Sequence, residues 1–267
     1  MKPINTAYPS RRIPGAVRSV YLGFFIALIV LFTLSKAGAV ITTSASTEAP
    51  DQNIFVNTIS DNAGNLAWNG TGITNARGQR NVGQTFLTPG LATESTLLQA
   101  VVFRIWEGLN DPTKPYIIPP AALGAAFTLQ IFQVASATAI PSTSSVPLYV
   151  GTGVTPSSLQ PSDYLSFTLD TPMSLTGGNY YAIQLNWNDV AEGRSLSFGQ
   201  STQLNYPNGT GFLQQNATAN SSLVYSTHGA DLHMMLVTMP EPGVLSLLGL
   251  CGGLALVALR KRRVSLA

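Results

Sequence analysis

The sequence predicts an all-β protein whose body is an antiparallel β-sandwich. In several short segments apolar and polar residues alternate, which is typical of a strand with one buried face. Clusters of Gly, Pro and Asn separate these segments, as in Gly177-Gly178-Asn179, and such residues supply the backbone dihedral angles of turns. The body shows no sustained apolar stripe with the 3.6-residue period of a helix. Roughly ten strands with polar turns favour two packed sheets.

Four segments carry the alternation most clearly, at residues 101–105, 127–131, 165–169 and 181–185. In the first of them Val101, Phe103 and Ile105 share one face, and Arg104 lies on the other. Weaker candidates for strands are residues 53–58, 82–87, 146–150, 195–199, 222–226 and 231–238. Two stretches rich in Pro, Ala, Ser and Thr are predicted to be long loops between strands, at residues 114–125 and 136–147.

The body is acidic, although the whole chain has a formal net charge of +2. Most of the basic residues lie near the two ends of the chain. Residues 40–239 contain five basic and eleven acidic residues, a net charge of −6. Binding to nucleic acid requires clustered Lys and Arg that neutralise phosphates. We therefore exclude nucleic acid as a partner of the body.

The first 39 residues have the three-part pattern of a secretory signal peptide. A basic segment precedes an apolar run at residues 20–34, and the small residues Ala37, Gly38 and Ala39 follow it. We predict an N-terminal signal helix with cleavage after Ala39, where Ala37 and Ala39 are the small residues of the cleavage site. The apolar run is at the upper length limit for a signal peptide, so an uncleaved signal anchor is the alternative.

A second apolar run lies near the C-terminus. Residues 243–259 carry no charge, and as a helix with ~1.5 Å rise per residue they would span about 25 Å, the low end for a transmembrane helix. A basic cluster follows directly and is predicted to stay on the cytoplasmic side as a stop-transfer signal: Arg260, Lys261, Arg262 and Arg263. The body must then lie on the other side of the membrane. The triplet Pro240, Glu241 and Pro242 precedes the run.

These three parts, in this order, closely resemble the PEP-CTERM sorting signal of Gram-negative bacteria, over residues 240–263. The resemblance implies that Pro240, Glu241 and Pro242 form the recognition triplet of an exosortase, a membrane transpeptidase that cleaves near it. It also implies that the C-terminal helix holds the protein transiently in the inner membrane. After processing, the protein would reach the cell surface or an extracellular matrix of exopolysaccharide. A plain single-pass anchor is the alternative.

The signals divide the chain into a signal peptide (1–39), a mature N-terminus (40–52), a sandwich domain (53–239) and the sorting signal (240–263). The mature N-terminus is rich in Ser and Thr without any period, so we predict that it is flexible. The only cysteine of the chain is Cys251, in the tail. The body therefore has neither a disulfide nor a thiol nucleophile and must fold through its hydrophobic core alone.

The order of segments in the body also resembles the jelly-roll sandwiches of exported bacterial proteins, among them domains similar to carbohydrate-binding modules. The resemblance rests on a series of segments that begins with Gly83-Gln84-Thr85-Phe86, continues through residues 98–103, 127–132, 165–169 and 175–183, and ends with Asp231-Leu232-His233-Met234. It implies a jelly-roll-like fold. Because unrelated functions share such folds, it does not identify a ligand.

No catalytic constellation is recognisable in the body. His228 and His233 are five residues apart, which on a strand places them on opposite faces and not as a pair of metal ligands; we expect His233 to be solvated. No Gly-x-Ser-x-Gly motif marks a nucleophile. Four carboxylates lie in turn-like surroundings, where solvation is more common than pairing for glycoside hydrolysis: Asp170, Asp189, Glu192 and Asp231. We predict that the protein is not an enzyme.

Sugar binding would require flat aromatic rings for the apolar face of a sugar and polar side chains for its hydroxyl groups. The candidates for such glycan contacts are Trp106 and Trp187, for which core packing is the competing role. We expect no cofactor and no catalytic metal. A structural calcium ion at Asp231 is the alternative, because Ca²⁺ prefers carboxylate and carbonyl oxygens.

We therefore expect an exported, non-catalytic protein of the cell envelope or extracellular matrix. Its expected partners are an exosortase and, before processing, the membrane. The alternative function is that of a carbohydrate-binding module that associates with exopolysaccharide. A secreted enzyme acting on glycans is a third and weaker hypothesis.

Overall fold

The structure, a computed structural model, describes residues 39–60, 64–70, 79–108, 116–189, 193–201, 206–216 and 223–239. These residues form an all-β body, as predicted, with a single 3-10 turn, η1 (Pro120–Ala122), as their helical part. The strands in the described residues are β1 (Ala39–Ser46), β2 (Ile54–Asn57), β3 (Gly64–Asn69), β4 (Arg80–Leu87), β5 (Ser95–Arg104), β6 (Ala126–Val134), β7 (Tyr149–Val154), β8 (Tyr164–Thr176), β9 (Tyr180–Trp187), β10 (Ser195–Gln200), β11 (Gly211–Asn216), β12 (Leu223–Thr227) and β13 (Met234–Thr238). None of the described helical residues belongs to a helix that could cross a membrane.

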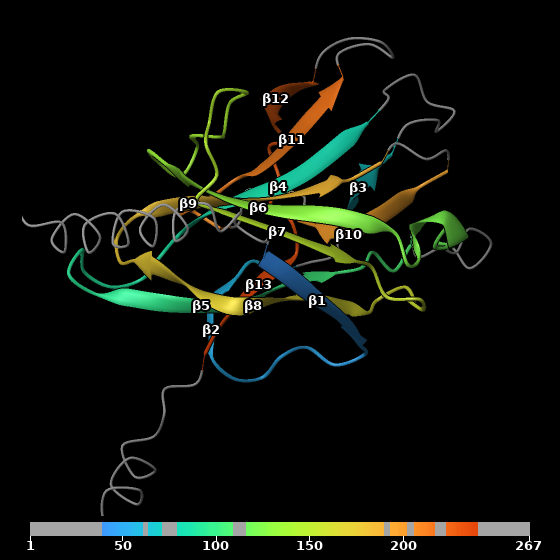
Figure 1. Cartoon of the computed structure of the whole chain (residues 1–267), viewed down its shortest axis with the longest axis horizontal. Coiled ribbons are helices and arrows are strands. Elements are labelled where there is room, and N and C mark those ends of the chain that lie inside the picture. Colours follow the sequence, from blue (N-terminus) through green and yellow to red (C-terminus); the bar gives the residue numbers. More distant parts are fainter. Residues whose placement is uncertain are drawn as a thin grey trace, which may run out of the picture. The chain divides into compact units, whose positions relative to one another are not determined.

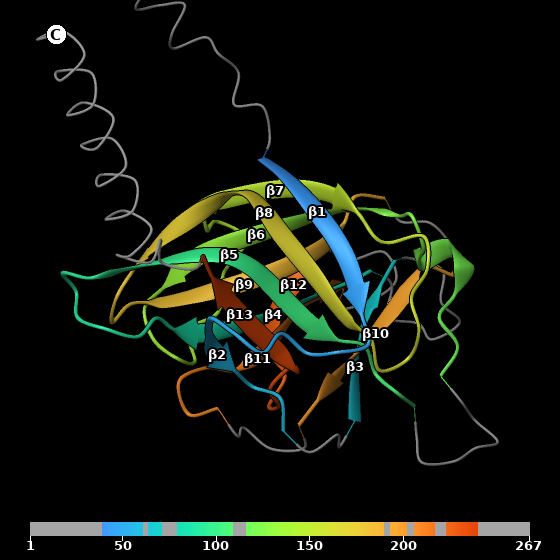
Figure 2. The ribbon, with the colours of Figure 1, turned by 90° about the horizontal axis from the view of Figure 1, so that it is seen from below.

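The strands form one curled, mixed sheet with two halves, which Figure 1 shows as two layers. The first half has the order β10-β3-β4-β9-β6-β7, and β11 and β12 extend it beside β4. The second half has the order β1-β8-β5-β13-β2. Strand β1 joins the halves, because Ala39 and Val40 pair in parallel with β7, whereas residues 41–46 pair antiparallel with β8 (Figure 2). The parallel ladder is a departure from the purely antiparallel arrangement that the sequence predicts.

Each segment with alternating residues lies in or overlaps a strand. Strands β3 and β11 were not predicted, because β3 begins with Gly-Asn and the Gly-Phe-Leu-Gln-Gln-Asn of β11 does not alternate. Strand β7 ends later than predicted, since it continues through Gly151 and Gly153 to Val154. These differences have one cause: strand pairing across the sheet extends ordered backbone beyond the residues whose own pattern is periodic.

The segment predicted to be a flexible mature N-terminus contains most of β1, so that prediction is wrong for residues 40–46. The side chain of Ile41 is 3% exposed and lies over the backbone of β7, where a Cβ atom at Gly151 or Gly153 would meet it. The hydroxyl of Thr43 donates a 2.6 Å hydrogen bond to the carbonyl of Val154. A strand that buries a single apolar side chain has no visible period, and this explains why local pattern did not reveal it.

The core lies between the two halves of the sheet and is dominated by aromatic rings. Phe127 of the first half meets Phe167 of the second edge to face, with ring centroids 5.0 Å apart and an interplanar angle of 87°. Phe103 and Phe198 also meet across the halves, with ring centroids 4.9 Å apart and the rings tilted at 34°. All four side chains are fully buried, and each contributes roughly 1.5–3 kcal/mol through removal of apolar surface from water.

Ile41→Ala is expected to destabilise the body by about 2–5 kcal/mol, because it removes buried apolar surface and leaves a cavity above β7. The control is Val40→Ala in the same strand, since Val40 is 58% exposed and its truncation should change the free energy of unfolding little. Urea denaturation of both variants measures the difference. Equal stabilities would show that β1 is not part of the cooperative fold.

Candidate functional site

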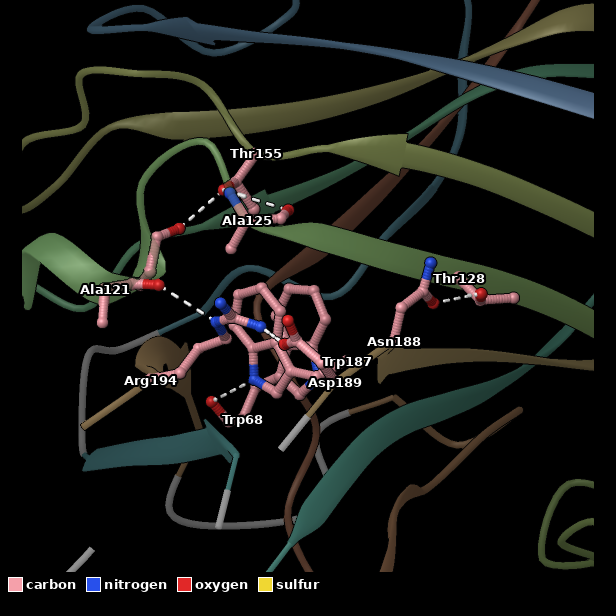
Figure 3. Close-up of polar contacts among 10 residues, drawn as sticks. Trp68, Ala121, Ala125, Thr128, Thr155, Trp187, Asn188, Asp189 and Arg194 are labelled. Carbon is pink, nitrogen blue, oxygen red and sulfur yellow. Dashed lines mark hydrogen bonds and ion pairs between the residues drawn. The ribbon is translucent and has the colours of Figure 1, made fainter. Parts of the chain in front are cut away.

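Trp187, predicted as a glycan contact, lies in the core instead (Figure 3). Its ring is 3% exposed and stacks on that of Trp68 at 3.7 Å and 6°, and its Nε1–H donates to the Trp68 carbonyl at 3.1 Å. The guanidinium of Arg194 lies 5.5 Å from the Trp187 ring centroid and forms an ion pair with Asp189. Arg194 Nε also donates to the carbonyl of Ala121 at 3.0 Å. This arrangement leaves no ring face of Trp187 for a ligand, and the prediction is wrong at this residue.

Trp106, the second predicted glycan contact, is only half-buried. Its ring lies 5.5 Å from that of Tyr116 at 52°, and its backbone N–H donates to the carbonyl of Ser197 at 2.8 Å. The phenolic oxygen of Tyr116 accepts from the Ser197 N–H, so the two aromatic residues are fixed to β10. A glycan contact at Trp106 stays a prediction.

Asp231 is fully buried, in contrast to the solvated position expected for it. Its carboxylate accepts 2.8 Å hydrogen bonds from Gln84 Nε2 and from the backbone N–H of Tyr206. Gln84 Oε1 in turn accepts from the N–H of Leu232 at 2.9 Å. The carboxylate therefore links β4 to the start of the last strand. The described residues contain no group of three or more His, Cys, Asp or Glu side chains placed to hold a metal ion, so calcium at Asp231 gains no support from geometry.

His233 is also fully buried, so the expectation of a solvated side chain is wrong. The His233 ring lies over Gly199 of β10, where a Cβ atom would approach Nδ1 to 2.6 Å, and the backbone N–H of His233 donates to the Gly199 carbonyl at 2.8 Å. Local alternation failed here because residues 230–236 are buried on both faces. His228 is separate and half-buried, with Nε2 2.7 Å from Gln200 Oε1.

The remaining predicted site residues form no common site in the described part of the chain. Asp170 is exposed and accepts from the neighbouring Thr171 N–H, while Asp189 is paired with Arg194. Several predictions fall outside the described residues: Glu192, the cleavage-site residue Ala37, the sorting triplet at 240–242 and the basic cluster at 260–263. Ala39 is the first residue of β1.

An extended side-chain network, which no local sequence pattern predicts, lies on the outer face of the first half of the sheet. Six amide side chains form a row that crosses β6, β9, β4 and β11, which we name the amide ladder: Gln79, Asn81, Gln130, Gln184, Asn186 and Gln214. Asn81 and Gln184 are buried at 2% and 1% exposure, whereas Gln130, Asn186 and Gln214 are half-buried. The ladder therefore has a rigid centre and an accessible surface.

Gln184 is the centre of the ladder. Its Nε2 group donates to Asn186 Oδ1 at 2.6 Å and to Gln214 Oε1 at 2.8 Å, which uses both of its N–H bonds. On one side Asn186 Nδ2 donates to Gln130 Oε1 at 2.8 Å. On the other side Asn81 Nδ2 donates to Gln214 Oε1 at 2.9 Å. Every amide in this row is thus oriented by its neighbours.

The outer amides keep unused donors. Each amide nitrogen carries two N–H bonds, yet the Nε2 groups of Gln130 and Gln214 have no hydrogen-bond acceptor within the part of the chain that the structure describes. Neither nitrogen is among the buried unpaired polar atoms, so both reach solvent. The ladder therefore presents oriented donors at two positions that lie several strands apart.

The absence of a side chain at Gly83 leaves room for the hydrogen bond between Gln184 and Gln214 across β4. Gly83 pairs with Gln184 across β4 and β9 and with Phe212 across β4 and β11. A Cβ atom at Gly83 would overlap both the Phe212 ring and the Ile183 carbonyl oxygen. Because β4 has no side chain at this point, Gln184 reaches across it to Gln214, and the Phe212 ring lies over Gly83.

Tyr225 of β12 closes the edge of the ladder. Its hydroxyl donates to Gln184 Oε1 at 2.9 Å, and its ring lies 6.2 Å from that of Phe212. Burial raises the pKa of Tyr225. The residues that share the ladder's face in the register of β6, β7, β9 and β12 are uncharged: Thr128, Phe132, Val150, Thr152, Ala182 and Thr227. At these described positions the face is therefore uncharged and combines polar with apolar side chains.

No protein-family model and no curated protein matches this chain. Two solved structures of Cwp84 resemble it at 12% sequence identity. One holds the cysteine protease and lectin-like domains of Cwp84, a surface layer associated protein of Clostridium difficile, with a TM-score of 0.37 over 62% of this chain and 33% of that one. The other is the clostridial cysteine protease after propeptide cleavage, with a TM-score of 0.42 over 73% of this chain and 42% of that one. The chain thus spans less than half of each structure, and scores this low establish no shared function.

Alkaline pH is expected to destabilise the body through its tyrosines. Burial is the main cause of raised pKa values at Tyr116, Tyr149, Tyr206 and Tyr225, and at Tyr149 the charge of Asp170 helps to raise the pKa to about 12. Unfolded tyrosines lose their protons near the ordinary pKa of 10.0. The stabilisation is therefore complete below pH 10 and is lost as the pH rises through about 12.

Urea midpoints measured at a series of pH values test this expectation. Tyr149→Phe should flatten the loss of stability between pH 10 and about 12, because the variant has no phenol to titrate there. Tyr164→Phe is the control, since Tyr164 is half-buried on a neighbouring strand pair. An identical pH dependence in wild type and Tyr149→Phe would contradict the assignment to Tyr149.

Proposed function

We propose that this chain is an exported, non-catalytic protein of the cell envelope or extracellular matrix whose body binds polysaccharide through the amide ladder. The observation that supports binding is the ladder itself, with oriented, solvent-facing amide donors on a rigid sheet. Sugar hydroxyls both donate and accept hydrogen bonds, and amide side chains offer both functions without charge. Sites of this kind need groups that are held in place before the ligand arrives, because ordering them costs binding free energy.

The amide side chains of the ladder are held in place in this way. Gln184 and Asn81 are almost completely buried and both hydrogen-bond to Gln214, so Gln214 cannot rotate without breaking hydrogen bonds; Asn186 is held in the same way by Gln184. Tyr225 adds a half-buried ring at the edge, where a sugar's apolar face finds a flat partner. The ladder contains no nucleophile and no general base, which favours a binding role over catalysis.

We further propose that the body is a jelly-roll-like sandwich. Four antiparallel pairs are nested along the sequence, with β6 and β7 innermost, then β5 and β8, then β4 and β9, and β2 and β13 outermost. A long strand hairpin that is wound around a core produces this nesting and divides its pairs between two halves. Strands β3, β10, β11 and β12 are then additions at the margin of the first half.

Export and sorting remain proposals that rest on the sequence signals. The described body ends where the proposed sorting triplet begins: β13 ends at Thr238, whose N–H donates to the Asn53 carbonyl at 2.8 Å, and the Met239 N–H donates to Leu97 at 3.1 Å. The triplet Pro240-Glu241-Pro242 follows without a linker. We propose an exosortase as the processing partner and the inner membrane as the site of a transient C-terminal anchor.

Full-length protein is expected to be retained on at least one insoluble or immobilised polysaccharide. The test uses a detergent without a sugar headgroup and a panel of cell-wall and capsular polysaccharides. Asn186→Ala should reduce retention about fivefold or more, because it removes the link between Gln184 and Gln130. Asn65→Ala, an exposed amide on β3 that bonds to Ser197, is the matched control. Absence of retention on every polysaccharide would contradict the binding proposal.

Two tail variants test the sorting proposal in the native host. Replacement of Arg260, Lys261, Arg262 and Arg263 with Ser should remove the stop-transfer signal, because a tail without cations crosses the bilayer more easily. Glu241→Ala should leave membrane insertion intact and prevent processing. Protease accessibility and the intact mass of the envelope protein distinguish the two. Equal anchoring and equal processing of both variants would contradict a two-signal tail.

A further inference from the structure

We propose that the ligand of the amide ladder is an uncharged polysaccharide chain that lies across the strands, along the ladder, and accepts hydrogen bonds from the Nε2 groups of Gln130 and Gln214. This inference rests on the proposed function and deepens it by naming the class of ligand and its direction. The ladder spans four neighbouring strands, β6, β9, β4 and β11, which at ~4.8 Å per strand spacing corresponds to about 14 Å. A row of that length fits several sugar units of an extended chain rather than a single monosaccharide.

The charge of the face selects against polyanions. The ladder consists of amides, and the register neighbours Thr128, Val150, Thr152 and Ala182 are uncharged. Residues 40–239 have a net charge of −6, so a polymer of uronates or sulfates would be repelled over the range of the Debye length. None of the four register neighbours carries a positive charge that could compensate that repulsion. An uncharged chain meets no such barrier.

The direction follows from the positions of the unused donors. Gln130 lies on β6 and Gln214 on β11, with β9 and β4 between them. A chain that follows one strand would reach only one of these two donors. A chain that crosses the strands reaches both, and it passes over the second N–H of Asn186 on the way.

The residues along the ladder divide into two roles. Gln130 and Gln214 contact the ligand, whereas the buried Gln184 is a positioning residue that fixes the carbonyl oxygens of its neighbours. Val150 pairs with Gln130 across β6 and β7 and is 41% exposed. It provides an apolar border beside a polar donor, which suits the mixed surface of a sugar ring.

Gln→Glu variants remove the proposed donors and preserve the ladder. In Gln130→Glu the carboxylate still accepts from Asn186 Nδ2, and in Gln214→Glu it still accepts from Gln184 and Asn81. Neither carboxylate has an N–H to give. We expect each variant to weaken binding of the retained polysaccharide about fivefold or more, with an unchanged midpoint of thermal unfolding. Gln133→Glu, which places the same charge at an exposed position of the same strand, is the matched control and should bind as wild type does.

The measurement is affinity electrophoresis of the full-length protein in gels that contain dextran, laminarin, mannan or xylan as uncharged polymers, or alginate or hyaluronate as anionic ones. We expect retardation by at least one uncharged polymer, lost in both Gln→Glu variants and unchanged between about 20 mM and about 500 mM NaCl. Retardation by the anionic polymers alone, still dependent on Asn186, overturns this inference and leaves the proposed function standing. Retardation that is insensitive to Gln130→Glu and Gln214→Glu overturns the assigned donors. Absence of retardation by any polymer overturns both proposals.

Discussion

The contact of aromatic rings between the two halves of the sheet is the interaction on which the rest of the body depends. The body has no disulfide, so the buried rings of Phe127, Phe167, Phe103 and Phe198 hold the halves together along with the pairing of β1 to both halves. Side chains alternate along a strand, so each inward residue fixes the orientation of its neighbours. In β9 the buried Ile183 and Leu185 force Gln184 and Asn186 onto the outer face. The position of the amide ladder is therefore a consequence of core packing.

Hydrogen bonds on the outer face offset the cost of burying the Gln184 side chain. Gln184 is 1% exposed although it faces away from the core, and burial of an amide without partners would be costly. Its two N–H bonds and its carbonyl oxygen are all engaged, with Asn186, Gln214 and Tyr225. These hydrogen bonds offset the cost of burying Gln184. The Nε2 groups of the ladder that lack an acceptor in the described residues belong to Gln130 and Gln214, which reach solvent. A network of this kind can be both structural and ready for a ligand.

Trp187 shows that a tryptophan in a polar sequence context can belong to the core, where it stacks on Trp68. Sequence context placed Trp187 beside Asn186 and Asn188 at a strand end, which is typical of a binding residue. In the fold, β10 and the 3-10 turn bring Arg194 and Ala121 to this end, and the cation over the ring excludes other partners. Asp231 and His233 were misjudged for a related reason, since both lie where strands far apart in sequence cover what looked like a surface.

The sequence by itself determined the all-β class and the approximate position of most strands, because alternation between core and solvent is a property of neighbouring residues. It also determined the acidic charge of the body and the two proposed export signals at its ends. Only the tertiary structure decided which residues meet. Gln184 bonds to Gln214 over a separation of 30 residues, and Asn186 bonds to Gln130 over 56. Strand register sets these contacts, and register depends on the packing of the whole core, so no local pattern could have revealed the ladder.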